Sequence, residues 1–579
     1  MCGIGGFIGT DQRLGEHTLA LFCEKLAHRG PNGKGQFLEN SVGLAHTRLS
    51  IQDVSAASNQ PFYSSSGRFV AVFNGEIYNF KELAREFQHL KTSSDTEVLV
   101  ALFEKYGIAC LQSLRGMFAI AIYDRQDRIV WLIRDRLGIK PLYYYVGKDF
   151  IAFASELKAL TAIQEIHGAL TLDYEAQNHY FHLGFVPEPH SIYREIKKFP
   201  SAHFARIDAS LQVVPTRYWA LDYTENPKIS YGEAKEQIHH LLISSVKEHL
   251  ISDVPLGLFL SGGTDSSLLA AIAQTYSGQP IKTFSIGFKD SSHNEAPFAK
   301  KIAQFLKTDH TEYMLGENEV LEIMEEVLDT YDEPFADSSA IPTLIISKLA
   351  SQKVKVALSG EGGDELFHGY GTYLWSERLS KKIVVENKRL LHIIAGKIPG
   401  IKAQKARKML SKVPNPLLPS HIFSLEHDFF TAREVYEMPN QKFFYHGYVL
   451  DDPTKNLTKL QNIFDFEVAL KDNLLVKVDR AGMRFGLETR VPFLDHRLVE
   501  WVVRLHDSYK SAGQTQKILL KEILYDYIPA SYFNRPKWGF GVDFKTIFLR
   551  TGYSYNKKFS PNQHYLWMIW ENFLTKRVE

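Results

Sequence analysis

The feature that most constrains the fold is an order of elements that occurs twice in the second half of the chain. Residues 254–276 (VPLGLFLSGGTDSSLLAAIAQTY) combine an apolar run, a glycine-rich turn and a helical pattern, and residues 354–367 (VKVALSGEGGDELF) repeat that order. A further apolar run, IKTFSIGF, and a helical pattern at 296–306 lie between them. Strands that alternate with helices predict a doubly wound parallel sheet that begins near residue 231.

The first 150 residues have a different pattern. GRFVAVFNGEIYN and RGMFAIAIYDRQDRIVWLIRDRLGIKPLYYY alternate apolar strands with polar turns, and a helical pattern covers about 94–106. This part therefore predicts layered β-sheet with a few helices. The two patterns predict two α/β domains, at residues 1–205 and 231–579, with a linker at 206–230 that contains Pro215 and Pro227.

Charge and cysteine content exclude several classes of protein. Lys plus Arg is 67 and Asp plus Glu is 66, a net charge of +1, which disfavours nucleic acid or an anionic membrane as a partner of the whole chain. No apolar run approaches the ~20 residues that span a bilayer, and the N-terminus has no secretory pattern. The three cysteines, Cys2, Cys23 and Cys110, form no disulfide framework and no CxxC metal motif, so we expect a cytoplasmic protein.

Two blocks carry charge of one sign. Residues 317–333 hold eight acids and no bases, and residues 381–412 hold ten bases and one acid. We interpret both as solvated helical faces. An alternative for the basic block is that it holds an acidic ligand or a partner.

Cys2 directly follows the initiator methionine. Removal of that methionine would give one residue with a thiol and a free α-amine, which titrates near ~7.7–8.0 and can accept a proton at neutral pH. An N-terminal nucleophile uses its own amine as the base in this way. A chance cysteine near a terminus is the alternative when Cys2 is taken alone.

Five further motifs follow Cys2 in a fixed order. They are HRGPNG, AHTRLSIQD, FNGEIYN, SDTEVL and RGMFAIAIYD, between residues 28 and 124. Together with MCGIGG they resemble the glutaminase domain of class II glutamine amidotransferases, which has the αββα sandwich of Ntn hydrolases. The resemblance implies an oxyanion hole from the Asn74 side chain and the Gly75 N–H. It implies glutamine binding by Arg48, Leu49, Ser50, Ile51, Gln52, Asn74, Gly75, Glu76 and Asp95. Asn-Gly also predicts a type I′ hairpin turn, which would expose the Gly75 donor.

The first glycine-rich turn, LSGGTDSSLL, lacks the lysine of a Walker A motif. Its glycines and the following helix N-terminus suit a phosphate cradle, and Asp265 beside a phosphate favours a Mg²⁺ ion between them. The turn resembles the PP-loop of enzymes that split ATP into AMP and pyrophosphate. ATP binding is thereby implied for Leu260, Ser261, Gly262, Gly263, Asp265, Ser266 and Ile286.

The second turn, SGEGGDELFHGY, is similar to another motif of PP-loop synthetases. The resemblance places Ser359 and Gly360 near the nucleotide, Asp364 as the second Mg²⁺ ligand and Glu361 beside the adenylated intermediate. The alternative is an acidic helix N-terminus that its dipole stabilises.

Two later segments, VKVDRAGMRFGLETRVPFLDHR and NRPKWGFGVDF, resemble the C-terminal half of glutamine-hydrolysing asparagine synthetases. The resemblance implies that Lys537 stabilises the departing pyrophosphate. It makes Asp479 and Arg480 candidate active-site groups, and Arg490 either a site residue or a structural ion pair. The run Trp538–Phe540 after the lysine also occurs in relatives that amidate sugars.

The resemblance covers nearly the whole chain. It implies an ATP- and Mg²⁺-dependent amidotransferase that adenylates a carboxylate, with ammonia from glutamine passing through a sheltered, apolar passage between the domains. Aspartate is the favoured acceptor, and a uronic-acid sugar or another carboxylate is the alternative. Small-molecule substrates are the expected partners, and a homodimer is compatible with the pattern.

Overall fold

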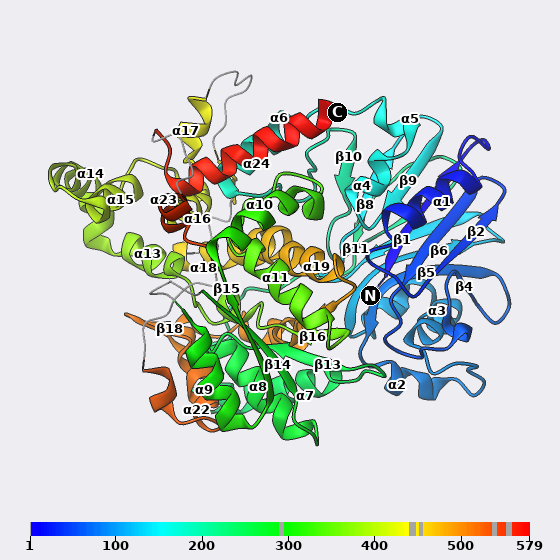
Figure 1. Ribbon diagram of the computed structural model, residues 1–579, viewed down its shortest axis with the longest axis horizontal. Coiled ribbons are helices and arrows are strands. Elements are labelled where there is room, and N and C mark those ends of the chain that lie inside the picture. Colours follow the sequence, from blue (N-terminus) through cyan, green and yellow to red (C-terminus); the bar gives the residue numbers. More distant parts are fainter. Residues whose placement is uncertain are drawn as a thin grey trace.

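A computed structural model describes residues 2–288, 294–438, 447–450, 456–534, 541–551 and 558–578. The N-terminal part contains two six-stranded sheets that lie face to face (Figure 1). The first has the order β10-β8-β9-β1-β3-β2, with bounds β1 Gly3–Gly9, β2 Gly33–Glu39, β3 Val42–Arg48, β8 Tyr143–Val146, β9 Phe150–Ala154 and β10 Ile196–Lys198. The second has the order β12-β11-β7-β6-β5-β4, with bounds β4 Phe62–Tyr63, β5 Phe69–Ile77, β6 Gly116–Asp124, β7 Ile129–Arg134, β11 His203–Ile207 and β12 Thr216–Arg217.

Apolar side chains hold these two sheets together. Ile4 and Leu44 of the first sheet share a buried cluster with Val72 and Leu132 of the second. Helices cover the outer faces, where Phe22 of α1 packs near Phe7 and Phe103 of α3 packs near Phe73. The helices of this part are α1 Glu16–Lys25, α2 Phe80–Leu83, α3 Asp95–Tyr106, α4 Leu157–Thr161, α5 Gln164–His167 and α6 Tyr174–Leu183. The αββα sandwich expected from the sequence is confirmed.

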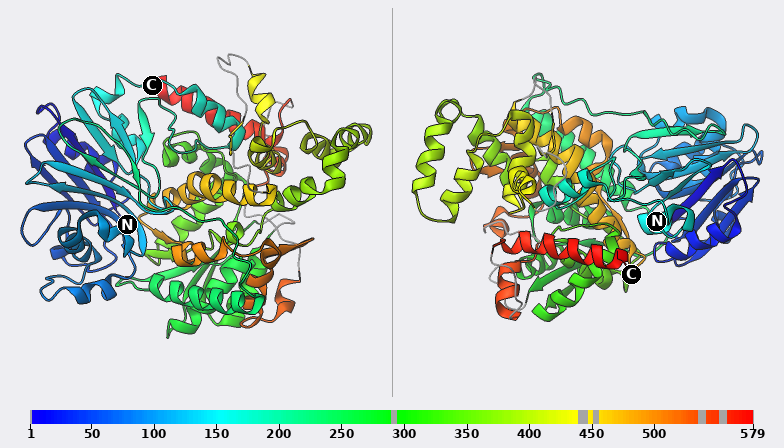
Figure 2. Two further views of the ribbon diagram at one scale, coloured as in Figure 1. Left: turned by 180° about the vertical axis from the view of Figure 1, so that it is seen from behind. Right: turned by 90° about the horizontal axis from the view of Figure 1, so that it is seen from above.

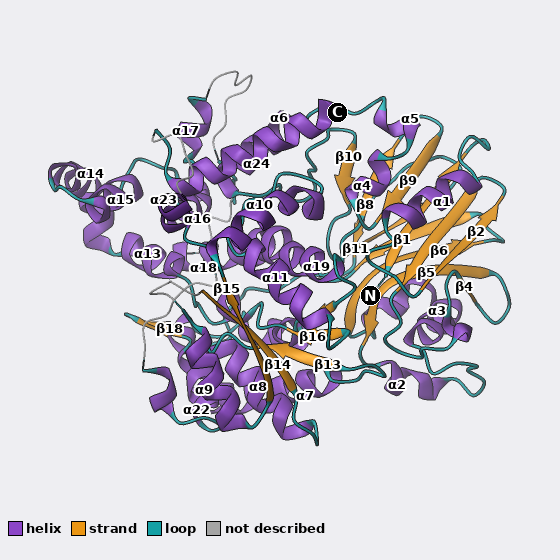
Figure 3. Ribbon diagram, in the orientation of Figure 1, coloured by secondary structure: helices purple, strands orange, loops and turns teal. Residues whose placement is uncertain are grey.

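The C-terminal part is built on one parallel sheet of order β15-β14-β13-β16-β17 (Figure 3). Its strands are β13 Leu256–Phe259, β14 Lys282–Phe288, β15 Asp309–Leu315, β16 Val356–Leu358 and β17 Glu488–Arg490, and a hairpin of β18 Ser511–Ala512 and β19 Thr515–Gln516 lies apart from it. Chain order runs outward from β13 to one edge and from β16 to the other. The adjacent ends of β13 and β16 are therefore the switch point where such sheets bind ligands.

Helices surround this sheet, as the sequence pattern predicts. They are α7 Tyr231–His249, α8 Thr264–Tyr276, α9 Ala296–Leu306, α10 Glu317–Tyr331, α11 Ala340–Ser351, α12 Gly363–Leu366, α13 Gly371–Ser380, α14 Lys382–Lys397, α15 Ile401–Met409, α16 Leu418–Glu426, α17 Ala432–Tyr436, α18 Leu457–Phe464, α19 Leu475–Met483, α20 His496–Val502, α21 Asp507–Lys510, α22 Ile518–Tyr525, α23 Phe544–Thr551 and α24 Pro561–Val578. A π-helical segment, Asp465–Leu474, joins α18 to α19. Among the described helices, none combines the length and apolarity needed to cross a bilayer.

Two features stand out at opposite ends of the molecule. The β-rich N-terminal part forms one end, and the pair α14 and α15 projects from the other (Figure 2). Helix α6, although it follows the first sheet in sequence, lies against the C-terminal part, where the Tyr180 hydroxyl donates to the Leu566 carbonyl at 2.7 Å. The two parts are thus joined by a broad contact rather than by residues 206–230 alone.

Candidate active sites

Cys2 lies at the start of the first sheet, against Asn74 of the second. Its backbone N–H donates to Asn74 Oδ1 at 3.0 Å, and both side chains are buried. Burial raises the pKa of the Cys2 thiol. The Asn74 amide nitrogen, Nδ2, is buried without a hydrogen-bond partner, a state that costs about 1–3 kcal/mol. The Asn74 side chain, which contacts the Cys2 backbone, therefore has an unused hydrogen-bond donor.

Asn74 and Gly75 do not form a hairpin turn. They lie inside β5 and pair with Ala119 and Phe118 of β6, so the type I′ turn predicted from Asn-Gly is wrong. The strand pairing wins because the flanking residues of β5 are apolar and buried. Glycine is required at 75 because a Cβ there would lie 2.0 Å from the Met117 carbonyl oxygen.

Two carboxylates lie next to this pair. Glu76 follows Gly75 in β5, and Asp95 begins α3. Asp95 accepts from the Ile77 N–H at 2.9 Å, and the Gln52 amide donates to Glu76 at 2.8 Å. Burial is the main cause that raises both pKa values, that of Asp95 to about 6. The site thus offers buried carboxylates to a cationic group.

Arg48 ends β3 and begins the loop that carries Leu49, Ser50, Ile51 and Gln52. Its guanidinium donates to the backbone carbonyls of Asp53 and Ser55 and to Asn59 Oδ1. Arg48 therefore shapes this loop in addition to the ligand role expected from the sequence. The structure brings the loop and the Glu76 carboxylate together through Gln52.

A second site opens at the switch point of the parallel sheet. Both glycine-rich turns line a cavity of about 720 Å³ at the ends of β13 and β16. Their strands pair in register, Leu258 with Leu358, so both turns leave the same sheet edge. The cavity wall contains every residue predicted to bind ATP, namely Leu260, Ser261, Gly262, Gly263, Asp265, Ser266, Ile286, Ser359 and Gly360, together with Glu361 and Asp364.

Asp265 and Asp364, the predicted magnesium ligands, converge on one cation. The Lys517 ammonium contacts both carboxylates, that of Asp364 at 2.6 Å. Burial opposes the charge on Lys517, but the two aspartates raise its pKa. Two carboxylate oxygens that reach one cation also suit Mg²⁺. Sequence reasoning missed Lys517, although two partly buried acids in neighbouring turns call for a basic partner.

Glu361 has a basic partner of its own. Lys477 of α19 lies 3.4 Å from the Glu361 carboxylate, 3.9 Å from Asp337 and 3.0 Å from the Ser339 hydroxyl. Burial raises the pKa of Glu361, and Lys477 opposes that shift. Lys477, which the sequence reasoning also missed, therefore places a positive charge against this acid on the cavity wall. Lys537 and the run Trp538–Phe540 lie outside the described residues.

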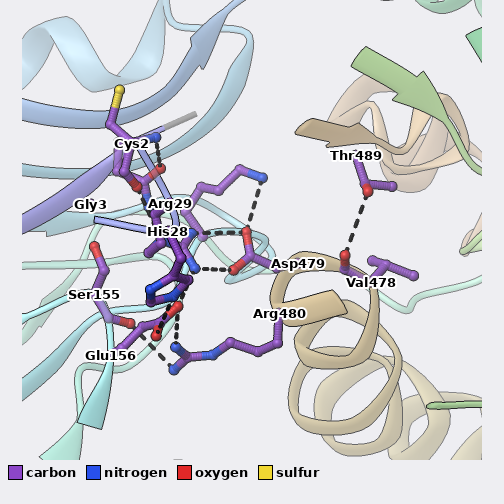
Figure 4. Close-up of polar contacts among 12 residues, drawn as sticks. Cys2, Gly3, His28, Arg29, Ser155, Glu156, Val478, Asp479, Arg480 and Thr489 are labelled. Atoms are coloured by element: carbon purple, nitrogen blue, oxygen red, sulfur yellow. Dashed lines mark hydrogen bonds and ion pairs between the residues drawn. The ribbon is translucent and has the colours of Figure 1, made fainter. Parts of the chain in front are cut away.

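Asp479 and Arg480 are not on the cavity wall. They lie between the two parts of the chain, where Asp479 accepts from Arg29 at 2.9 Å and Arg480 pairs with Glu156 at 2.7 Å (Figure 4). Arg29 also pairs with Glu156 at 2.7 Å and donates to the Cys2 carbonyl at 3.1 Å. The interpretation of these two residues as active-site groups is therefore corrected: they join the parts.

Apolar side chains of both parts meet between the two sites. Leu49, Ile51 and Met117, near the first site, share one buried cluster with Val491 and Leu494 of the C-terminal part. Arg490 belongs to this boundary too, since its guanidinium approaches Glu76.

Comparison with known proteins identifies both parts. Residues 1–219 match the glutamine amidotransferase domain, and residues 237–557 match asparagine synthase. The chain is 35% identical over 519 residues to a putative glutamine-hydrolysing asparagine synthetase 2 of Methanocaldococcus jannaschii, covering 83% of this chain and 98% of that one. It is 32% identical over 568 residues to glutamine-hydrolysing asparagine synthetase 1 of Bacillus subtilis, covering 94% and 87%. It is also 27% identical over 575 residues to a protein named amidase chyE of Penicillium rubens, covering 90% and 83%.

The fold and the two sites define a carbon–nitrogen ligase of the amidotransferase type. The chain belongs to the asparagine synthase family, whose members use ATP and glutamine.

Proposed function

We propose that the chain moves the amide nitrogen of glutamine to the side-chain carboxylate of aspartate, which it first adenylates with ATP. The products would be asparagine, glutamate, AMP and pyrophosphate. The observation that carries the proposal is the unpartnered Asn74 Nδ2 beside Cys2. A buried donor without a partner is costly, and a transition-state oxyanion would satisfy it.

In the first half-reaction the Cys2 thiolate attacks the amide carbon of glutamine. The oxyanion accepts from Asn74 Nδ2 and the Gly75 N–H, and the Cys2 α-amine delivers the thiol proton to the leaving ammonia. Water then hydrolyses the thioester to glutamate. Glu76 and Asp95 meet the α-ammonium of glutamine, and Arg48 with residues 49–52 meets its α-carboxylate.

In the second half-reaction the acceptor carboxylate attacks the α-phosphorus of ATP and pyrophosphate leaves. Backbone amides of the turn at Ser261–Ser266 and the start of α8 would hold the phosphates. Asp265 and Asp364 would hold Mg²⁺, which neutralises charge on the leaving pyrophosphate. Glu361, paired with Lys477, is proposed to orient the adenylated acceptor. Lys537 is proposed to assist pyrophosphate departure.

Ammonia then attacks the acyl-adenylate and AMP leaves. Free ammonia is mostly protonated in water at neutral pH, so a dry route between the sites keeps it nucleophilic. The apolar cluster that Met117 and Leu494 share across the boundary supports such a route. We assign residues 1–205 to the glutaminase unit and 231–579 to the synthetase unit.

The names of the relatives favour aspartate as the acceptor, since two of them are called asparagine synthetases. A sugar uronate or another carboxylate is the second candidate. Two observations favour this second candidate. One is the Trp538–Phe540 run, and the other is that a relative which matches most of the chain is named an amidase and not an asparagine synthetase.

The test is acceptor-dependent release of pyrophosphate. The purified chain is incubated with MgATP and glutamine, with and without aspartate, and asparagine is measured by chromatography. Aspartate-dependent release of pyrophosphate, with an equal amount of asparagine formed, supports the proposal. Active glutamine hydrolysis without that stimulation contradicts aspartate as the acceptor and turns the assay to uronates. Absence of glutamine hydrolysis contradicts the first half-reaction.

A further inference from the structure

The helix α14 presents an apolar stripe to solvent. None of its side chains is buried. Three large apolar residues of the helix follow one another at intervals of seven and four, which places them on one helix face. They are Ile383, Leu390 and Ile394, exposed by 69%, 55% and 45%, and the C-cap residue Ile398, exposed by 53%, follows them. A soluble protein rarely exposes such a continuous row without a use for it.

The stripe is not needed to hold the helix in place. The side of α14 that carries Val384 packs against a cluster of Leu379, Met409 and Leu425. The His392 ring bonds the Arg407 carbonyl of α15 at 3.0 Å. The pair α14 and α15, which we call the basic hairpin, is therefore held by other side chains, and the stripe stays exposed beside these contacts.

The same hairpin concentrates positive charge. Residues 381–412 hold ten bases and one acid in a chain whose net charge is +1. Lys381, Lys382, Lys405 and Lys408 are in ion pairs with neighbouring glutamates. Within the described part of the chain, six bases have no ion-pair partner: Lys388, Arg389, Lys397, Lys402, Arg407 and Lys412.

We propose that the basic hairpin docks on an anionic phospholipid surface, with the stripe of Ile383, Leu390 and Ile394 in the headgroup boundary and the lysines and arginines on the phosphates. An apolar face flanked by Lys and Arg is the pattern of helices that lie in a membrane interface. Its position at the end of the molecule away from the β-sheets leaves the hairpin free to reach a flat surface (Figure 2).

Two other partners for the basic hairpin are disfavoured. A second copy that met the hairpin face to face would bring the two sets of bases together, which repels. A nucleic acid would use the bases but leave the row of Ile and Leu side chains exposed. The near-neutral charge of the whole chain disfavours general attraction to membranes, so binding would depend on this one segment.

The test is sedimentation of the full chain with phospholipid vesicles. Vesicles of phosphatidylcholine alone are compared with vesicles that contain 30% phosphatidylglycerol, at 100 mM and 500 mM NaCl. We expect binding to the anionic vesicles that is about tenfold stronger than to neutral ones and that falls about tenfold at high salt. The double variant Leu390→Gln/Ile394→Gln should lose at least about tenfold in partition coefficient.

The matched control is Val214→Gln, which changes an apolar residue of 67% exposure elsewhere in the chain and should bind like the parent. Glutamine hydrolysis and circular dichroism check that each variant is folded. Absence of vesicle binding by the parent chain overturns the proposal. Binding that the double variant retains overturns it too, because charge alone would then explain it. Concentration-dependent self-association that the double variant loses would show a second copy as the occupant instead.

Discussion

The guanidinium of Arg490, in the synthetase part, lies 3.4 Å from the carboxylate of Glu76, in the glutaminase part. Arg490 is completely buried and also bonds the Glu488 carboxylate at 2.6 Å. Its own carbonyl accepts from the Ser359 N–H, in the second glycine-rich turn, at 2.8 Å. One residue thus contacts the proposed glutamine-binding acid with its side chain and the proposed nucleotide loop with its backbone.

Substitution of Arg490, which lies in the synthetase part, should weaken glutamine binding in the glutaminase part. Burial and the Glu488 charge raise the pKa of Glu76, and Arg490 opposes that shift. In Arg490→Gln we expect Glu76 to take up a proton and KM for glutamine to rise about tenfold, the effect of a lost charge contact worth ~1.4 kcal/mol. Arg490→Lys should recover part of this loss. Ammonia-dependent synthesis serves as the control, and an unchanged KM for glutamine in both variants would refute the role.

Cys2→Ala should abolish glutamine-dependent synthesis and leave ammonia-dependent synthesis intact. The thiol is the only proposed nucleophile for the amide, whereas the synthetase cavity does not contain it. Pyrophosphate release is measured with glutamine or with ammonium chloride as the nitrogen source. Cys110→Ala, which removes another buried thiol, is the matched control. Loss of both activities in Cys2→Ala would contradict two separate sites.

Asp265→Ala should lower pyrophosphate formation at least about a hundredfold while glutamine hydrolysis persists. The substitution removes one of the two carboxylates that would hold the metal on the phosphates. The metal would neutralise the negative charge that develops on the leaving pyrophosphate. Both activities are measured on one preparation. If hydrolysis disappears with pyrophosphate release, the two sites are coupled more tightly than the structure suggests.

The glutaminase reaction should weaken in mild acid. Burial raises the pKa of Asp95 to about 6, and the proposed ammonium contact needs the ionised form. Protonation increases as pH falls, so kcat/KM for glutamine, which reports groups of the free enzyme, should fall about fourfold between pH 7.5 and 5.5. Asp95→Asn should be poorly active and should lose this dependence. A profile that is flat over the same interval in the parent would exclude Asp95 from glutamine binding.

Asp479→Asn should destabilise the joint between the domains. Asp479 is buried against Arg29 and Lys140, and removal of its charge leaves those cations under-compensated at a cost of about 3 kcal/mol. The first unfolding transition in urea gives the loss. Asp127→Asn, which removes a half-exposed partner of Arg68, should cost less than about 1 kcal/mol. Equal losses in the two variants would contradict the importance of the buried pair.

Much of the fold could be predicted because its signals are local. The alternation of apolar runs, glycine-rich turns and helical patterns predicted β13, α8, β14, α9 and β16 at the positions where they occur. The helix predicted at about 94–106 is α3, with Ser94 as its N-cap. Asn74 and Gly75 failed as a turn because a local dipeptide preference was outweighed by the pairing of β5 with β6.

The sites could be predicted only where a motif carries them. Residues of both glycine-rich turns line one cavity, as expected, because adjacent parallel strands end at one edge. Lys517 lies outside the quoted motifs, and Lys477 lies in one whose resemblance implied no role for it. Both are distant in sequence from the acids they contact. Asp479 and Arg480 were misplaced for the opposite reason, since a family motif does not distinguish a residue that joins domains from one that touches a substrate.

Lys517 lies between Asp265 and Asp364 and forms an ion pair with each. A magnesium ion that binds both carboxylates must first displace the Lys517 ammonium. Because Lys517 is part of the chain, its ammonium competes at a higher local concentration than ions free in solution reach. Bare metal should therefore bind weakly, and metal that arrives already bound to a triphosphate should bind well, because the phosphates then give the displaced Lys517 a new anionic partner. The enzyme would therefore select a metal ion that is already bound to a nucleotide triphosphate over the free ion.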